Sequence, residues 1–96
     1  MAFNVIAKST LRAFWQKHAD SEDALTACYK LISKGDFSSF AQLRETFSSA
    51  ELVLPDYVIF NLKGNYYRLI TRISFSYKTV WVKNVFTHAE YDRWTP

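Results

Sequence analysis

The spacing of apolar residues changes once along the chain. Between residues 9 and 47 the apolar side chains recur three and four positions apart, as in helices with one buried face. From Tyr57 to Phe86 apolar and polar residues alternate, as in half-buried strands. The pattern predicts an α+β fold, with N-terminal helices packed on one face of a twisted antiparallel sheet and a short C-terminal helix after it.

Turn and capping residues divide the first half into short elements. The expected elements are a strand over 2–7, two helices over 10–18 and 22–34, and a short third helix over 40–47. Ser9 or Thr10 can cap the first helix, and Asp20 or Ser21 the second, because their side chains accept from free backbone amides. Residues 48–56, which contain Pro55, are expected to form a loop.

Three antiparallel strands are expected over 57–63, 66–75 and 78–86. Gly64-Asn65 suits a two-residue type II′ turn, which places Asn61 opposite Arg68. If Tyr77-Lys78 forms the second turn, Lys83 lies opposite Arg72, and Phe86 pairs with Leu69 on the core face. The other face should stay open to solvent, and it should carry Asn61, Lys63, Tyr66, Arg68, Arg72, Trp81 and Lys83.

Length and composition favour one globular domain over residues 1–96. The chain is 49% hydrophobic and contains one cysteine, Cys28, which excludes an internal disulfide and is typical of a reducing compartment. Cys28 falls on the apolar face of the second expected helix, so we interpret it as an inert core thiol. No segment has the length of a membrane span or the pattern of a signal peptide. We therefore expect a cytoplasmic protein with no membrane partner.

The positive charge is concentrated in the second half. Residues 1–56 contain six Lys or Arg and seven Asp or Glu, whereas residues 57–96 contain six and two. The second half is therefore the candidate surface for a polyanion, although its charge is too small to predict tight binding to duplex DNA.

Candidate chemistry follows the last expected strand, in Thr87-His88-Ala89-Glu90-Tyr91-Asp92. Thr87 and Glu90 have the spacing of a capping box, which is their simplest interpretation. His88 would begin the helix, where a neutral imidazole can accept or share a proton, and Tyr91 or Asp92 could orient its ring. A surface histidine at a helix start is the alternative.

The basic strand residues suit phosphate chemistry. Lys63 and Arg68 could stabilise the charge that develops on a phosphorane, with Arg72 and Lys83 as further contacts, and Tyr66 and Trp81 could stack bases. Ordinary solvated strand positions are the alternative for each. The two histidines lack metal-ligand spacing and no Gly-rich loop is present, so we predict neither a metal nor a cofactor.

Two blocks of sequence resemble a known family. They are Phe60-Asn61-Leu62-Lys63-Gly64-Asn65 with Tyr67-Arg68-Leu69, and Thr87-His88-Ala89-Glu90-Tyr91-Asp92. Together they look like the HigB-type toxins of bacterial type II toxin–antitoxin systems, which are similar to RelE-like toxins. The N-terminal half resembles the family more weakly, through Phe14-Trp15, His18 and Tyr29-Lys30.

The resemblance implies a small microbial-ribonuclease-type fold and a metal-independent endoribonuclease that cuts mRNA on the translating 70S ribosome. It also implies a HigA-type helix-turn-helix antitoxin that neutralises the toxin, the complex binding promoter DNA through the antitoxin. Carried over, Lys63 and Arg68 would hold the scissile phosphate and His88 would transfer a proton. Tyr91 and Asp92 would support His88, while Asn61 and Asn65 would shape the site.

Two other functions stay open at this point. A non-catalytic RNA- or ribosome-binding module would use the same basic face, with Glu90 serving only as a helix cap. A gyrase-directed toxin on the related scaffold is the other alternative. Tyr66 departs from the family pattern, in which a charged or polar residue is common at this position.

Overall fold

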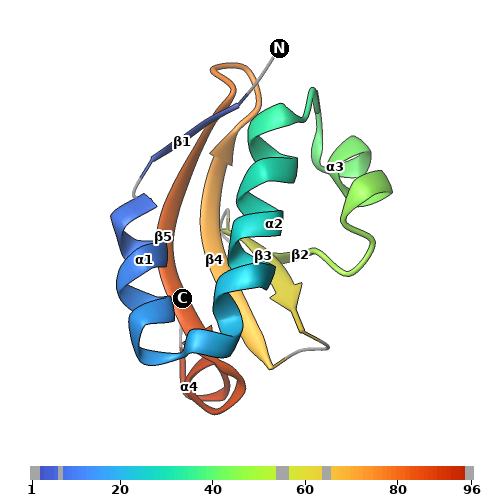
Figure 1. Ribbon diagram of the computed structural model, residues 1–96. Helices are drawn as coiled ribbons and strands as arrows, with labels where there is room; N and C mark the ends of the chain where they lie inside the picture. The colour runs from blue at the N-terminus through green and yellow to red at the C-terminus, as the bar shows by residue number, and fades with distance from the viewer. Residues whose placement is uncertain (1–2, 7, 54–56, 64–65, 95–96) are drawn as a thin grey trace.

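The computed structural model describes residues 3–6, 8–53, 57–63 and 66–94. It confirms the α+β fold predicted from the sequence (Figure 1). The elements are, in order, β1 (Asn4–Ile6), α1 (Lys8–Lys17), a 3₁₀ turn (Ala19–Ser21), α2 (Glu22–Lys34), α3 (Phe40–Thr46), β2 (Glu51–Val53), β3 (Tyr57–Leu62), β4 (Tyr67–Ser74), β5 (Thr79–Thr87) and α4 (His88–Asp92).

The sheet has the strand order β1-β5-β4-β3-β2. Strands β2, β3, β4 and β5 form the predicted antiparallel sheet, and β1 joins its edge parallel to β5, a pairing that the prediction did not include. The loop expected over 48–56 was also wrong in part. Glu51–Val53 forms an edge strand that pairs with β3, and residues 54–56 lie outside the described residues.

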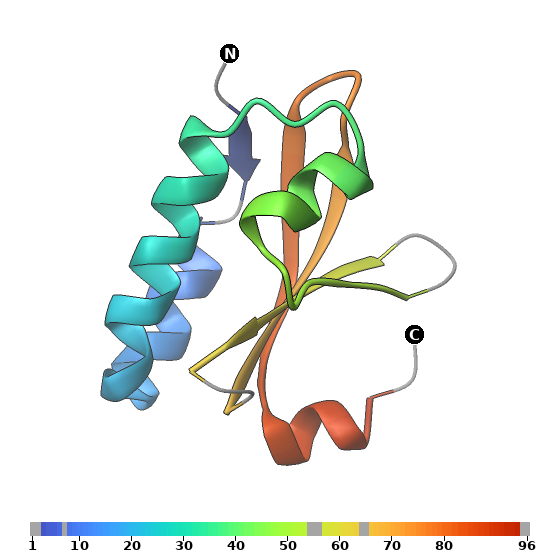
Figure 2. The same cartoon turned by 90° about the vertical axis from the view of Figure 1, so that its right-hand side faces the viewer.

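Helices α1 and α2 cover one face of the sheet, which we call the helical face (Figures 1 and 2). Their buried stripes, which include Leu11, Leu25 and Ile32, pack against Phe60, Leu69 and other residues that alternate along the strands. Cys28 belongs to this core, and burial raises the pKa of its thiol to about 12, which agrees with an inert side chain.

The side chains expected to cap α1 and α2 do not cap these helices, although one of them stands at the expected position. Ser9 and Thr10 lie inside α1, which already begins at Lys8. Ser21 occupies the N-cap position of α2, but its hydroxyl donates to the carbonyl of His18 at 2.6 Å and does not accept from the helix. The 3₁₀ turn between the helices accounts for this, because it brings the two residues together.

The register between β3 and β4 matches the prediction, with Asn61 opposite Arg68, whereas Gly64-Asn65 falls outside the described residues. The register between β4 and β5 was wrong. The turn spans residues 75–78, which places Trp81 and not Lys83 opposite Arg72. The pairing then skips Lys83, a bulge that shifts every later residue of β5 by one position.

The bulge has a clear effect on packing. Val85 joins the core on the helical face, and Phe86, which was expected there, contacts the ring of Trp94 at 6.0 Å between centroids. Because the bulge interrupts the alternation of side chains, the sequence pattern assigns residues at the end of β5 to the wrong face.

The opposite face of the sheet, the second face, carries Ile59, Asn61, Arg68, Ile70, Arg72 and Trp81. The sequence had predicted a face open to solvent, but part of this face is buried. Ile59 and Ile70 are completely buried, and the Trp94 ring packs edge-on against Tyr57 at 5.2 Å. The segment after α4 therefore covers part of this face (Figure 2). None of the described helices is long and apolar enough to cross a membrane.

Candidate functional site

Arg68 forms the centre of a polar cluster on the second face. Its side chain is only 11% exposed, and its Nη1 donates to the side-chain oxygen of Asn61 on the neighbouring strand. The same Nη1 lies 3.4 Å from a carboxylate oxygen of Glu51. The Tyr91 ring of α4 stacks on the guanidinium, 4.8 Å from its carbon to the ring centroid. Four elements thus meet at one cation.

Asn61 connects the members of this cluster. Its amide nitrogen donates to the Ser49 carbonyl at 2.6 Å and to the Glu51 carboxylate at 3.2 Å, while its oxygen accepts from Arg68. An amide can do this because it carries both a donor and an acceptor group. The result is a guanidinium held in one orientation, the arrangement needed to bind an anionic phosphate in a defined position.

Two electrostatic features mark the cluster as a candidate binding site. The Arg68 Nε is buried and has no hydrogen-bond partner among the described residues, which is costly for a donor and leaves it able to bind an acceptor. Burial raises the pKa of Tyr91, and the nearby Glu51 carboxylate adds to the effect. Both effects keep the phenol of Tyr91 in its protonated form, which can donate a hydrogen bond.

Glu51 was missed by the sequence analysis because it fell in the expected loop. Its side chain is half exposed, so its carboxylate is accessible beside the cation that it contacts. The available signal was the apolar run Leu52-Val53-Leu54 beside it, but a run this short cannot be distinguished from a loop.

Helix α4 begins with the predicted capping box. The Thr87 hydroxyl accepts from the amide of Glu90 at 3.3 Å, and the Glu90 carboxylate accepts from the amide of Thr87 at 2.9 Å. The capping interpretation of both residues is confirmed. The box fixes the start of α4, and with it the position of His88 and Tyr91.

His88 pairs with Asp92 one turn later, as the sequence suggested. The distance between Nδ1 and the carboxylate oxygen is 3.1 Å, and both side chains are more than half exposed. When Nδ1 donates to Asp92, Nε2 carries the lone pair of the neutral ring and can accept a proton. The backbone amide of His88 also donates to the Tyr66 carbonyl at 2.9 Å, which ties α4 to the start of β4.

The sequence had predicted Lys63 on the same face as Arg68, but the structure places its side chain elsewhere. Its amine lies 3.4 Å from the Asp20 carboxylate, and the Tyr67 hydroxyl donates to the same carboxylate at 2.6 Å. Tyr67 belongs to the core on the helical face. The hydrogen bond from Tyr67, with the charge of Lys63, lowers the pKa of Asp20.

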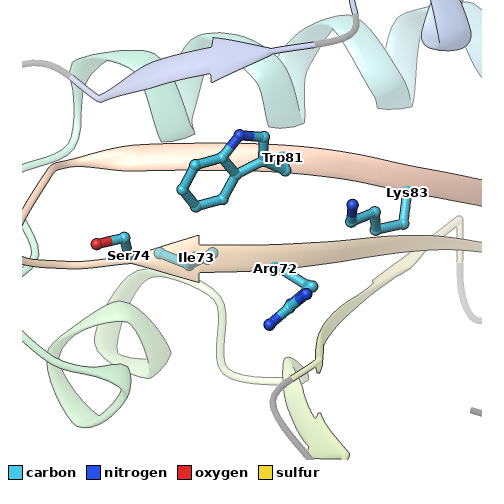
Figure 3. A pocket seen from close by; sticks show the side chains of 5 residues that line it. All are labelled: Arg72, Ile73, Ser74, Trp81 and Lys83. Atoms are coloured by element: carbon cyan, nitrogen blue, oxygen red, sulfur yellow. The ribbon is translucent and has the colours of Figure 1, made fainter.

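The remaining basic residues lie further along the second face. Arg72, Trp81 and Lys83 line a groove of about 420 Å³ over β4 and β5, together with Ile73 and Ser74 (Figure 3). Of the other predicted site residues, Asp92 and Glu90 stand on α4, and Asn65 lies outside the described residues. The structure thus brings Asn61, Arg68 and Tyr91 together and separates them from Lys63.

A family model described as HigB_toxin, the RelE-like toxic component of a toxin-antitoxin system, matches residues 21–94. The chain belongs to this family. It is also similar to proteins named mRNA interferase HigB from Escherichia coli O6:H1 and mRNA interferase toxin HigB from Escherichia coli K12. The first is 29% identical over 94 residues, covering 96% of this chain and 91% of the relative, and the second 28%, covering 96% and 90%.

The family match includes every residue of the candidate site. It begins at Ser21, before α2, and ends at Trp94, so it contains Glu51, Arg68 and all of α4. Membership of the HigB toxin family identifies the chain as the toxic component of a toxin–antitoxin system, which implies a cognate antitoxin as its partner.

Proposed function

We propose that this HigB-family toxin is an mRNA interferase, an endoribonuclease that cuts mRNA on the translating 70S ribosome and so arrests translation. The observation that carries the proposal is the Arg68 cluster, a preorganised and largely buried cation on the second face. The names of the similar proteins support the same activity. Action on translating ribosomes places the toxin in the cytoplasm.

The proposed reaction is an in-line attack within the RNA. The 2′-hydroxyl gives its proton to His88 Nε2, and the 2′-oxygen forms a bond to the adjacent phosphorus. The bond from phosphorus to the 5′-oxygen breaks, and that oxygen takes a proton from solvent, to which His88 later releases the proton it accepted, leaving a 2′,3′-cyclic phosphate and a 5′-hydroxyl. As in the RelE-type reaction that the resemblance implies, the step uses no metal.

Each residue of the site has a role in this reaction. Arg68 neutralises the charge that develops on the phosphate oxygens, Asn61 fixes the guanidinium, and Tyr91 supports it from the other side. Asp92 holds the His88 ring. Lys63 lies apart from this cluster, so its proposed part is a separate phosphate contact, since its exposed pairing with Asp20 is of the kind that costs little to exchange.

Control by a partner is the second part of the proposal. The cognate antitoxin is of the HigA type, a helix-turn-helix protein, and it neutralises the toxin. The complex of the two binds its own promoter DNA through the antitoxin. The excess of Lys and Arg in residues 57–96 supports an acidic antitoxin surface, because a polyanionic partner and RNA would compete for the same basic half.

Primer extension on a defined mRNA, with and without translating ribosomes, tests the activity. We expect ribosome-dependent cuts by the wild type and a loss of about 10²- to 10³-fold in Arg68→Ala. His88→Ala should lose a similar factor of about 10² or more, as expected for a general base. Lys34→Ala, an exposed residue at the end of α2, serves as the charge-matched control and should cut normally.

The result also separates the alternatives. Cuts that persist in His88→Ala but not in Arg68→Ala would move the proton transfer to another group, of which the Glu51 carboxylate is the nearest to Arg68 in this cluster. No cuts by the wild type, together with ribosome binding that Arg68→Ala weakens, would replace the nuclease by the binding module.

A further inference from the structure

The groove over β4 and β5 lies outside the cluster that the proposed reaction uses. Its walls include the indole of Trp81, which is 37% exposed, and the basic side chains of Arg72 and Lys83 (Figure 3). An exposed indole beside two cations presents a flat apolar surface next to positive charge, which is the combination that single-stranded nucleic acid requires.

The register of the sheet places this groove relative to Arg68. Arg68 and Arg72 are four residues apart on β4, so their side chains point to the same face. The strand rise places their Cα atoms roughly 13 Å apart. Trp81 is the residue of β5 directly opposite Arg72. The groove is therefore a continuation of the candidate site along one strand, on the face that Arg68 occupies.

The bulge in β5 contributes to the groove. The pairing of β4 and β5 skips Lys83, which is two residues after Trp81 on the same strand. Bulges bend a strand and redirect side chains, and they are frequent beside functional sites. In this sheet the bulge occurs at the residue that supplies the second cation of the groove.

We infer that this groove is a nucleotide subsite, in which Trp81 stacks on a base of the mRNA and Arg72 and Lys83 contact its phosphate. The inference rests on the proposed function and adds to it the nucleotide that flanks the cleaved bond. An aromatic platform with adjacent cations is how proteins bind single-stranded nucleic acid, and the stacking tolerates every base. The continuity with Arg68 assigns the nucleotide to the cleaved strand.

Binding of a fluorescein-labelled, single-stranded 2′-O-methyl RNA, measured by anisotropy with the full-length toxin, tests the subsite. The RNA lacks a free 2′-hydroxyl, so binding is measured without cleavage. Trp81→Ala should weaken affinity by about 5- to 150-fold, the range measured for removal of one base–aromatic stack, and Trp81→Phe should restore most of it. Tyr77→Ala, which removes an aromatic ring that is 81% exposed in the hairpin turn, should bind as the wild type does.

The salt dependence tests the phosphate contact separately. Lys83→Ala should reduce the slope of log affinity against log salt by about 0.7, as expected for one lost contact to a single strand, and Lys83→Arg should keep the slope. Thermal unfolding of each variant shows that it is folded. The subsite is refuted if Trp81→Ala binds no more weakly than Tyr77→Ala, or if the slope in Lys83→Ala is unchanged.

A crosslink identifies the source of the nucleotide. With 4-thiouridine placed in the mRNA of a stalled ribosome complex, we expect the crosslinked peptide to contain Trp81. A crosslink of that peptide to ribosomal RNA alone would overturn the assignment. The failure of the subsite can be distinguished from the failure of the nuclease. Normal cleavage and normal RNA binding in Trp81→Ala would refute only the subsite. RNA binding that depends on Trp81, in a wild type that does not cleave mRNA, would refute only the nuclease.

Discussion

At the scale of single residues, the most informative side chain is Asn61. It accepts from Arg68 and donates to Ser49 and to Glu51, so one amide satisfies the polar groups of three other residues. A cation that is only 11% exposed needs such partners, because an unpaired charge at this depth costs several kcal/mol. Asn61 therefore stabilises the fold and positions the guanidinium.

Replacing Asn61 tests this double role. We expect Asn61→Ala to lower the free energy of unfolding by about 1–2 kcal/mol, because the Arg68 and Ser49 groups lose their partner while they remain partly buried. Urea unfolding measures the change. Asn84→Ala removes an exposed amide on β5 and should leave the stability unchanged. Equal stabilities of the two variants would contradict the role of Asn61.

The carboxylate of Asp20 gives a pH-dependent prediction at the same scale. The Tyr67 hydrogen bond lowers the pKa of Asp20 in the folded protein below its ordinary 3.8, so folding is favoured above pH 3.8 and the gain is lost as the pH falls through the lower, folded value. Tyr67→Phe should raise the pKa of Asp20 towards 3.8. Carboxyl NMR shifts of Asp20 during an acid titration measure this change.

The same variant should also lose less stability between neutral pH and pH 2 than the wild type, since its Asp20 differs less between the folded and unfolded states. Thermal unfolding at both pH values provides the comparison. An unchanged Asp20 titration in Tyr67→Phe would show that contacts other than the Tyr67 hydrogen bond, among them Lys63, set the pKa.

The sequence predicted the positions of site residues correctly inside regular strands, where side chains alternate between the two faces. It failed for residues beyond the ends of these strands. Asn61 and Arg68 were placed together correctly because both lie inside regular strands. Lys63 was placed on the wrong face because its φ is 49°, in the left-handed region. At that point the backbone leaves the strand geometry, and the period of two no longer predicts the direction of a side chain.

At the scale of elements, α4 depends on its cap more than most helices do. It has only five residues, too few to be stable from its own hydrogen bonds, and its capping box supplies two further bonds at the first turn. The cap therefore controls the placement of His88 and Tyr91 as well as the stability of the helix.

Substitution of Thr87 separates these contributions. We expect Thr87→Ala to cost about 1 kcal/mol of stability and to reduce mRNA cleavage, whereas Thr87→Ser should retain both because it keeps the accepting oxygen. Thermal unfolding and primer extension measure the two effects. Cleavage that is unaffected in Thr87→Ala would show that the cap does not position the site.

Two elements were beyond prediction for physical reasons. Strand β2 has three residues and pairs only with β3, so its structure is determined by contacts distant in sequence rather than by its own pattern. The bulge at Lys83 contains no glycine that would have indicated it in the sequence. The four-residue turn before it also shifts the pairing of β5 with β4 away from the predicted register. The long, strongly periodic elements α2, β3 and β4 were predicted nearly to their ends.

At the scale of the whole molecule, the sheet has apolar residues buried on both faces. The larger core lies under α1, α2 and α3, and a smaller one contains Ile59 and Ile70 on the second face. Trp94 packs against Tyr57 and Phe86 on this second face, and Tyr91 on the same segment stacks on Arg68. The segment that packs on the second face thus also completes the candidate site.

Removal of the Trp94 ring should therefore affect stability and activity together. Trp94→Ala exposes Tyr57 and Phe86, and we expect a loss of about 2 kcal/mol in the free energy of unfolding, below the full cost of a buried tryptophan because the ring is only partly buried. In a chain of 96 residues this corresponds to a melting temperature lower by about 8–16 °C. Trp94→Phe keeps an edge-on ring and should lose less than half as much.

The link to the site predicts one more difference. Because Tyr91 and Trp94 pack on each other at 5.8 Å, Trp94→Ala should also loosen the contact of Tyr91 with Arg68 and reduce mRNA cleavage at a temperature where the variant is fully folded. Leu31→Ala, which removes an exposed leucine of α2, should change neither quantity. If Trp94→Ala melts early but cleaves normally below its melting temperature, the C-terminal segment packs on the second face without positioning Arg68.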